Sequence, residues 1–223
     1  MIISVSRRED IPRFRFEWFM ERLETGWVDV RNPFNALQVR RVSLKPQDAE
    51  VLVFWTRDPR SILAHAAVLE DRGYRFYVMT TLTAYPEILE PNIPAPQTII
   101  AAMGELAKKI GPERNIWRYD PLFLSDCTDP AFHAGNFRRL SRALEGTVRR
   151  VILSVYDEYG GAGRRVATRE KDGSLKPLPH YTPEGTLLPG LKDLLSRLAD
   201  MAREAGMGIY ACAEAENLEN QGI

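Results

Sequence analysis

The chain has 223 residues, of which 44% are hydrophobic and 27% are charged, and its thirty basic residues balance its thirty acidic ones. This composition is that of an ordinary soluble globular protein, and the length suits one large α/β domain. A net charge of zero gives no long-range field for nucleic acid or an anionic membrane, which argues against both as partners.

Short apolar runs alternate with longer amphipathic stretches along the chain, in the pattern of strands and helices. A small hairpin is predicted around Pro33, with strands at 27–31 and 39–43. The other predicted strands are 2–5, 51–55, 76–81, 115–118, 151–155 and 208–211. The predicted helices are 16–24, 62–69, 98–110, 130–144 and 191–205.

This alternation predicts right-handed βαβ units and a parallel sheet. We expect an α/β fold, a TIM-like parallel βα barrel that is incomplete, with about six strands. No linker divides the chain, so residues 1–223 are expected to form a single domain. A doubly wound open sheet is the alternative, but no Gly-x-Gly-x-x-Gly follows a predicted strand.

Polar side chains follow every strand of the predicted sheet. Because the carboxyl ends of parallel strands lie at one end of a barrel, these residues are expected to converge there. The residues concerned are Ser6, Arg7, Arg8 and Asp10, then Thr56, Arg57 and Asp58, then Thr80, Thr81, Thr83 and Tyr85, then Arg118, Tyr119 and Asp120, then Tyr156, Asp157 and Glu158, and last Cys212 and Glu214.

From this set we predict an enzyme site for an anionic small molecule. A guanidinium presents a rigid fork of donors that matches a carboxylate or a phosphate. The predicted substrate-binding residues are Arg7, Arg8, Arg57, Arg118 and Tyr119, and the predicted general acids or bases are Asp10, Asp120, Asp157 and Glu214. Two alternatives stay open: exposed loops are polar for no functional reason, and each arginine can pair with a nearby aspartate as scaffolding.

Residues 156–189 exceed a normal loop length and are interpreted as either a lid or a disordered excursion. His180 lies within this segment and reaches the site only if the segment folds over it. The tryptophans are expected in the core rather than at a base-stacking surface; they are Trp18, Trp27, Trp55 and Trp117.

Only two cysteines occur, Cys127 and Cys212, which rules out a disulfide framework and a Cys-x-x-Cys zinc site. No metal site is predicted, although oxygen ligation of a hard metal such as magnesium by Asp10, Asp120, Asp157 or Glu214 stays open as an alternative. No apolar stretch reaches the length of a membrane helix, and the chain begins in a strand rather than in a signal peptide. A cytoplasmic protein is therefore expected.

Several short motifs resemble those of a bacterial family classed as a domain of unknown function. They are Ser6-Arg7-Arg8-Glu9-Asp10-Ile11-Pro12, Val30-Arg31-Asn32-Pro33-Phe34-Asn35, Phe54-Trp55-Thr56-Arg57-Asp58-Pro59, Gly111-Pro112-Glu113-Arg114-Asn115-Ile116-Trp117-Arg118-Tyr119-Asp120-Pro121 and Cys212-Ala213-Glu214. They span nearly the whole chain and are far more specific together than singly. Glu9 stands where that family usually has Thr.

The resemblance implies a second hypothesis. Longer members of the family end in Cys-x3-Cys-x2-Cys, which is similar to the iron–sulfur motif of radical S-adenosylmethionine enzymes. An iron–sulfur cluster and S-adenosylmethionine are therefore expected only if the native chain continues past Ile223, and an end so soon after a strand favours truncation. A third hypothesis is a non-catalytic module that binds nucleic acid or protein, which the neutral charge disfavours. The oligomeric state is not predicted.

Overall fold

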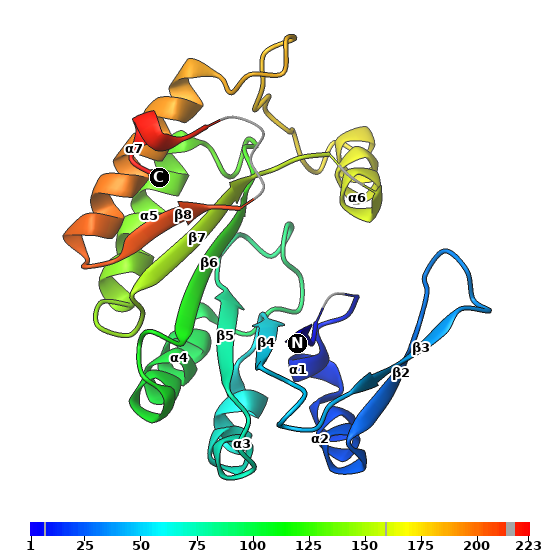
Figure 1. Ribbon diagram of the computed structural model, residues 1–223. Helices are drawn as coiled ribbons and strands as arrows, with labels where there is room; N and C mark the ends of the chain where they lie inside the picture. Colours follow the sequence, from blue (N-terminus) through cyan, green and yellow to red (C-terminus); the bar gives the residue numbers. More distant parts are fainter. Residues whose placement is uncertain (7, 159, 213–216) are drawn as a thin grey trace.

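Figure 1 shows the computed structural model, which describes residues 1–6, 8–158, 160–212 and 217–223. Its centre is a six-stranded sheet in the order β1-β4-β5-β6-β7-β8, and every neighbouring pair is parallel. The strands are β1 (Ile2–Ser4), β4 (Val51–Thr56), β5 (Phe76–Thr81), β6 (Asn115–Leu122), β7 (Arg150–Val155) and β8 (Gly208–Ala211). The predicted α/β fold with a parallel sheet is confirmed.

Most helices that connect these strands cover one face of the sheet, whereas the helix Gly160–Lys171 lies on the other side (Figure 1). The strand order follows the chain without reversing, and right-handed crossovers then place their packed helices on the same side. A doubly wound sheet would reverse its strand order, so that alternative is wrong. The helices are α1 (Ile11–Phe14), α2 (Phe16–Thr25), α3 (Arg60–Asp71), α4 (Pro96–Ile110), α5 (Pro130–Ala143), α6 (Gly160–Lys171), α7 (Pro189–Glu204) and the short η1 (Glu219–Gln221).

Alternation along β6 sends its side chains to two different environments. Trp117 and Tyr119 are fully buried in the core that the sheet forms with α5 and α7. Ile116 packs instead with Val53 and Met79 in a small cluster on the opposite face. Arg118 and Asp120 alternate with the core residues, so they belong to this second face, which we call the inner face.

The inner face is only partly covered. Trp55 of β4 is 39% exposed and Tyr210 of β8 is 52% exposed. The prediction that the tryptophans are core residues is confirmed for Trp117 but wrong for Trp55 and for Trp18, which is also exposed. Buried strands are apolar on both sides, and the sequence of β4 alone does not show that one side is open.

Two elements project beyond the sheet on its open side (Figure 1). One is the predicted hairpin, β2 (Trp27–Arg31) paired antiparallel with β3 (Val39–Ser43). The other is α6, in the segment interpreted as a lid or a disordered excursion. The helix was missed because it starts with Gly160, Gly161 and Gly163, and glycine is among the poorest helix formers. Among the described residues, no helix combines the length and apolar character that a membrane crossing needs.

Candidate functional site

A charged cluster lies on the inner face near the carboxyl ends of the strands. Arg118 of β6 forms an ion pair with Asp120, which also accepts a hydrogen bond from Ser154 of β7. The guanidinium of Arg118 lies over the ring of Trp55, 4.4 Å from its centroid. The side chains of Arg118 and Asp120 are only 7% and 17% exposed. The pair is therefore largely withdrawn from water, where charges interact more strongly.

A second ion pair lies in the loops after β4 and β5. Arg57 follows β4 and pairs with Glu90, whose carboxylate also accepts a hydrogen bond of 2.6 Å from Thr83. The Glu90 side chain is 10% exposed. Thr83 and Glu90 therefore hold the Arg57 guanidinium at the end of the sheet.

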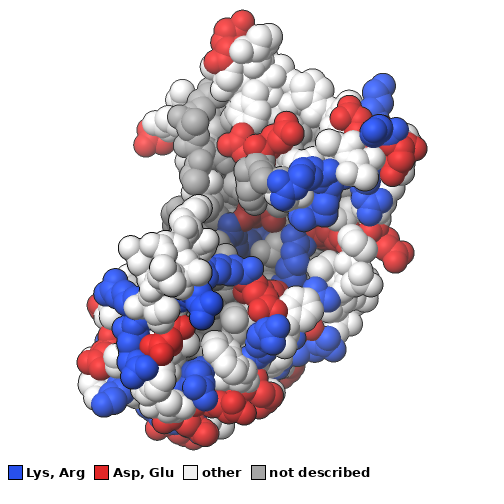
Figure 2. Space-filling model, turned by 90° about the vertical axis from the view of Figure 1, so that its right-hand side faces the viewer, with Lys and Arg blue, Asp and Glu red and all other residues white. Residues whose placement is uncertain are grey.

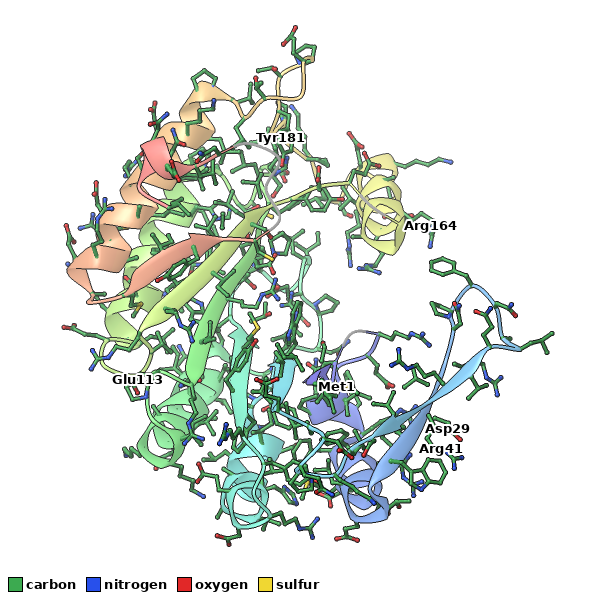
Figure 3. All side chains as sticks on the ribbon, viewed as in Figure 1. Met1, Asp29, Arg41, Glu113, Arg164 and Tyr181 are labelled. Carbon is green, nitrogen blue, oxygen red and sulfur yellow. The ribbon has the colours of Figure 1, made fainter. Side chains whose placement is uncertain are left out.

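Between these loops and α6 lies a cavity of about 300 Å³, which we call the arginine cavity. Its walls include Arg57, Glu90, Phe123, Tyr156, Arg165 and Arg169. Figure 2 shows a hollow on this side of the molecule with basic side chains along it. On α6, Arg165 and Arg169 are one turn apart and thus share one side of the helix. Arg164, labelled in Figure 3, lies toward the outer side and does not line the arginine cavity.

Asp10 has a structural partner for each carboxylate oxygen. Oδ1 accepts from the Arg13 amide at 3.1 Å, which makes Asp10 the N-cap of α1, and Oδ2 accepts from the Arg57 amide at 2.8 Å. Burial raises the pKa of this carboxyl, against the lowering effect of those amides. Asp10 thereby ties α1 to the end of β4 and positions the backbone of Arg57.

Replacing Asp10 by alanine is expected to lower the free energy of unfolding by about 1–2 kcal/mol, the usual cost of a lost N-cap. Asn keeps an acceptor oxygen, so Asp10→Asn is expected to recover part of that loss. Urea denaturation of the three proteins measures both effects. Equal stability of Asp10→Ala and the parent chain would contradict the cap assignment.

Tyr119 lies on the helix side of β6, away from the inner face. Its hydroxyl is 2.9 Å from Nδ1 of His133 and accepts a hydrogen bond from Asn136 at 3.2 Å. Burial raises the pKa of the Tyr119 phenol. The structure therefore does not bring Tyr119 together with the arginines, although it follows Arg118 directly in the chain.

The other predicted site residues are scattered. Arg8 is exposed and donates a hydrogen bond to the carbonyl of Arg31 in the hairpin, at 2.7 Å. Asp157 is exposed and lines a different cavity beside α6. Arg7 and Glu214 lie outside the described residues. The structure therefore gathers Arg57, Arg118 and Asp120 at the end of the sheet and places Arg8 at the hairpin.

Sequence reasoning missed Glu90, Arg165 and Arg169, and set His180 aside. His180 is buried, and its Nε2 accepts a hydrogen bond from the Leu124 amide at 2.8 Å. A spacing of four between Arg165 and Arg169 was visible in the sequence, but it carries meaning only on a helix. Glu90 offered no signal, because its partner is thirty-three residues away.

The residues present do not fit an iron–sulfur cluster, which needs three or four thiolates. The chain has two cysteines. Cys127 lies 3.3 Å from the Ser125 hydroxyl, and Cys212 follows β8 at another place in the fold. The described residues contain no group of three His, Cys, Asp or Glu side chains arranged to hold a metal ion.

A family model, described as domain of unknown function DUF1848, matches residues 2–223, essentially the whole chain. The chain belongs to this DUF1848 family. A comparison with curated proteins found no match.

Within this DUF1848 chain, two of the motifs that carry the family resemblance meet in space. Residues 54–59 supply Trp55 and Arg57, and residues 111–121 supply Arg118 and Asp120. Arg118 contacts Trp55 across the intervening strand β5. The motifs therefore describe one region of the inner face rather than separate turns.

Proposed function

We propose that this protein binds an anionic small molecule in the arginine cavity and acts on it as an enzyme. The observation that carries the proposal is that Arg165 and Arg169 line the cavity and form no ion pair among the described residues. Arg57 lies in the same wall, held by Glu90. Hydrogen bonds from Ser174 and the charge of Arg169 lower the pKa of Asp172. Neither the Arg165 nor the Arg169 guanidinium is held in an ion pair among the described residues, however, which leaves N–H donors for a ligand carboxylate or phosphate.

The position of the cavity supports the proposal. It lies at the carboxyl ends of parallel strands, where open and closed α/β sheets alike bind their ligands. Its walls combine these charges with the apolar rings of Phe123 and Tyr156, the usual mixture in a small-molecule site. The described sheet has the uninterrupted strand order of a βα barrel, and we propose that residues 1–223 form one domain with a TIM-like, incomplete barrel.

Asp120 is the proposed general acid or base. It comes directly before Pro121, which lines the arginine cavity, and its oxygens are held by Arg118 and Ser154. A carboxylate held in one position next to the cavity wall is suited to proton transfer, although Asp120 itself does not line the cavity. Arg118, stacked on Trp55, then positions Asp120 instead of contacting the ligand directly.

Inorganic phosphate is a direct probe of the arginine cavity. The double variant Arg165→Ala/Arg169→Ala is expected to weaken phosphate binding by about tenfold or more, since each charge-assisted hydrogen bond contributes about 1.5–3 kcal/mol. Arg164→Ala is the matched control, one residue away on the same helix but outside the cavity. Isothermal titration calorimetry measures both affinities. Equal affinities in the double variant, the control and the parent chain would refute the proposed site.

A further inference from the structure

A second cavity lies beside the arginine cavity and is lined by aromatic rings. Its volume is about 320 Å³, and its walls include Phe123, Tyr156, His180 and Tyr181. The rings form a connected group: the centroids of Phe123 and Tyr156 are 4.8 Å apart, and His180 lies 5.7 Å from Phe123 and 5.6 Å from Tyr156. We call this space the aromatic cavity.

The charged residues of the aromatic cavity are all acidic. Asp157, Glu158 and Glu170 line it, and none of the three forms an ion pair among the described residues. The arginines of α6 belong to other walls: Arg165 and Arg169 line the arginine cavity. The two cavities beside α6 therefore carry opposite charges.

Gly163 leaves room for the Glu158 side chain to lie against α6. A Cβ at position 163 would lie 2.8 Å from Cγ of Glu158 and 3.1 Å from its Oε1. Gly163 itself lines the aromatic cavity. The glycines that weaken the start of α6 as a helix thus leave room for an acidic side chain beside the aromatic rings.

His180 adds a neutral ring with a spare donor. Its Nε2 accepts from the Leu124 amide, so the proton of the neutral ring is on Nδ1. Nδ1 has no hydrogen-bond partner among the described residues, and it is not one of the fully buried unpaired atoms, so water or a ligand can reach it. Burial lowers the pKa of His180 to about 4, so the ring brings no positive charge at neutral pH. A ligand with an acceptor oxygen would satisfy this donor.

We infer that the aromatic cavity binds an organic cation that carries an oxygen acceptor, of the amino-alcohol type. Ring faces attract ammonium groups, and a methylated ammonium buried among rings is a recurring recognition mode. Asp157, Glu158 and Glu170 provide the opposite charge. Phe123, Tyr156 and Val166 line both cavities, so one ligand can occupy the two together. The substrate of the proposed function is then a zwitterion, with its anionic group in the arginine cavity and its cationic group in the aromatic cavity. This last conclusion rests on the proposed function.

Choline is the probe, and its uncharged carbon analogue 3,3-dimethylbutan-1-ol is the matched control ligand, with the same shape and hydroxyl group. Calorimetric titration of the full chain is expected to show choline binding at least about tenfold more tightly than the alcohol, because only choline carries the charge. Equal affinities for the two ligands, or no saturable binding of choline, would overturn the inference.

Variants of the carboxylates complete the experiment. Asp157→Asn/Glu158→Gln and Glu170→Gln are each expected to weaken choline binding by about threefold or more, while Glu184→Gln, an exposed residue outside the cavity, leaves it unchanged. Unchanged choline affinity in both cavity variants would refute the site. Phosphate titration of the same proteins tests the arginine cavity separately. Choline binding without phosphate binding would refute only the proposed function. Phosphate binding without choline binding would refute only this inference.

Discussion

Replacement of Arg118 by alanine is expected to lower the free energy of unfolding by about 3 kcal/mol, within the 3–5 kcal/mol that breaking a buried ion pair costs. The reason is the Asp120 carboxylate, which is 17% exposed and would lose its opposite charge. Ser154 would remain as a hydrogen-bond donor, but a hydroxyl does not neutralise a carboxylate. The variant also loses the contact between the guanidinium and the Trp55 ring.

A double-mutant cycle separates these contributions. The double variant Arg118→Ala/Asp120→Ala removes both charges. Its loss of stability is expected to be smaller than the sum of the losses in the two single variants, because no charge remains buried alone. Urea denaturation at neutral pH measures the four proteins. The expected coupling energy is about 1–3 kcal/mol.

Arg41 provides a comparison on the surface. It forms a bidentate ion pair with Asp29 on the hairpin and lies over the Trp27 ring, but the side chains of Arg41 and Asp29 are 61% and 39% exposed. Arg41→Ala is therefore expected to cost only about 0–1 kcal/mol through the lost ion pair. If Arg118→Ala cost no more than Arg41→Ala, burial of the Arg118–Asp120 pair would have no energetic role.

Acidification is expected to destabilise the protein between about pH 6.5 and pH 4 through His133 and His180. Burial lowers the pKa of each ring to about 4. In the folded state His133 donates from Nε2 to the Phe123 carbonyl at 3.0 Å, and its Nδ1 lies 2.9 Å from the Tyr119 hydroxyl. The ring is therefore neutral and fully paired at neutral pH.

The direction follows from proton binding. Between pH 6.5 and pH 4 the unfolded chain binds more protons at these rings than the folded chain does, so stability is present above the unfolded pKa and is lost as pH falls. Each ring is expected to lower the free energy of unfolding by about 2 kcal/mol at pH 5 and by about 3 kcal/mol below pH 4. Asp10 acts in the opposite direction, because burial raises its folded pKa.

The variant His133→Gln isolates the contribution of one ring. Glutamine has a donor and an acceptor but does not titrate. The unfolding free energy of the parent chain minus that of the variant is therefore expected to fall by about 2 kcal/mol between pH 7 and pH 5. The titration of the carboxylates is the same in both proteins, so it cancels in this difference. A difference that stays constant with pH would show that His133 does not carry the acid sensitivity.

The sheet could be predicted from the sequence because its signals are local. Apolar runs such as that of β4 are bounded by turn residues, and the alternation of strands with amphipathic helices gives the parallel order with few alternatives. The helix boundaries were also close: α4 was expected at 98–110 and is found at Pro96–Ile110. Each of these features depends on neighbours a few residues apart.

The candidate site was predictable only in part. Arg57, Arg118 and Asp120 lie at the same end of the sheet, as expected, but β6 runs to Leu122, so Arg118 and Asp120 are within that strand and not after it. Placement at a strand end could not separate Arg118 from Tyr119, because consecutive residues of a strand face opposite sides and the sequence does not say which side is open. The glycine-rich start of α6 concealed the helix that carries Arg165 and Arg169.

The sequence by itself thus determined the α/β class, the parallel sheet and the end at which its charges gather, since periodicity and turn chemistry are local properties. The tertiary structure decided which charges are partnered. Glu90 pairs with Arg57 and Asp10 holds the Arg57 backbone, whereas Arg165 and Arg169 form no ion pair among the described residues. Those contacts join residues tens of positions apart, and no local pattern encodes them.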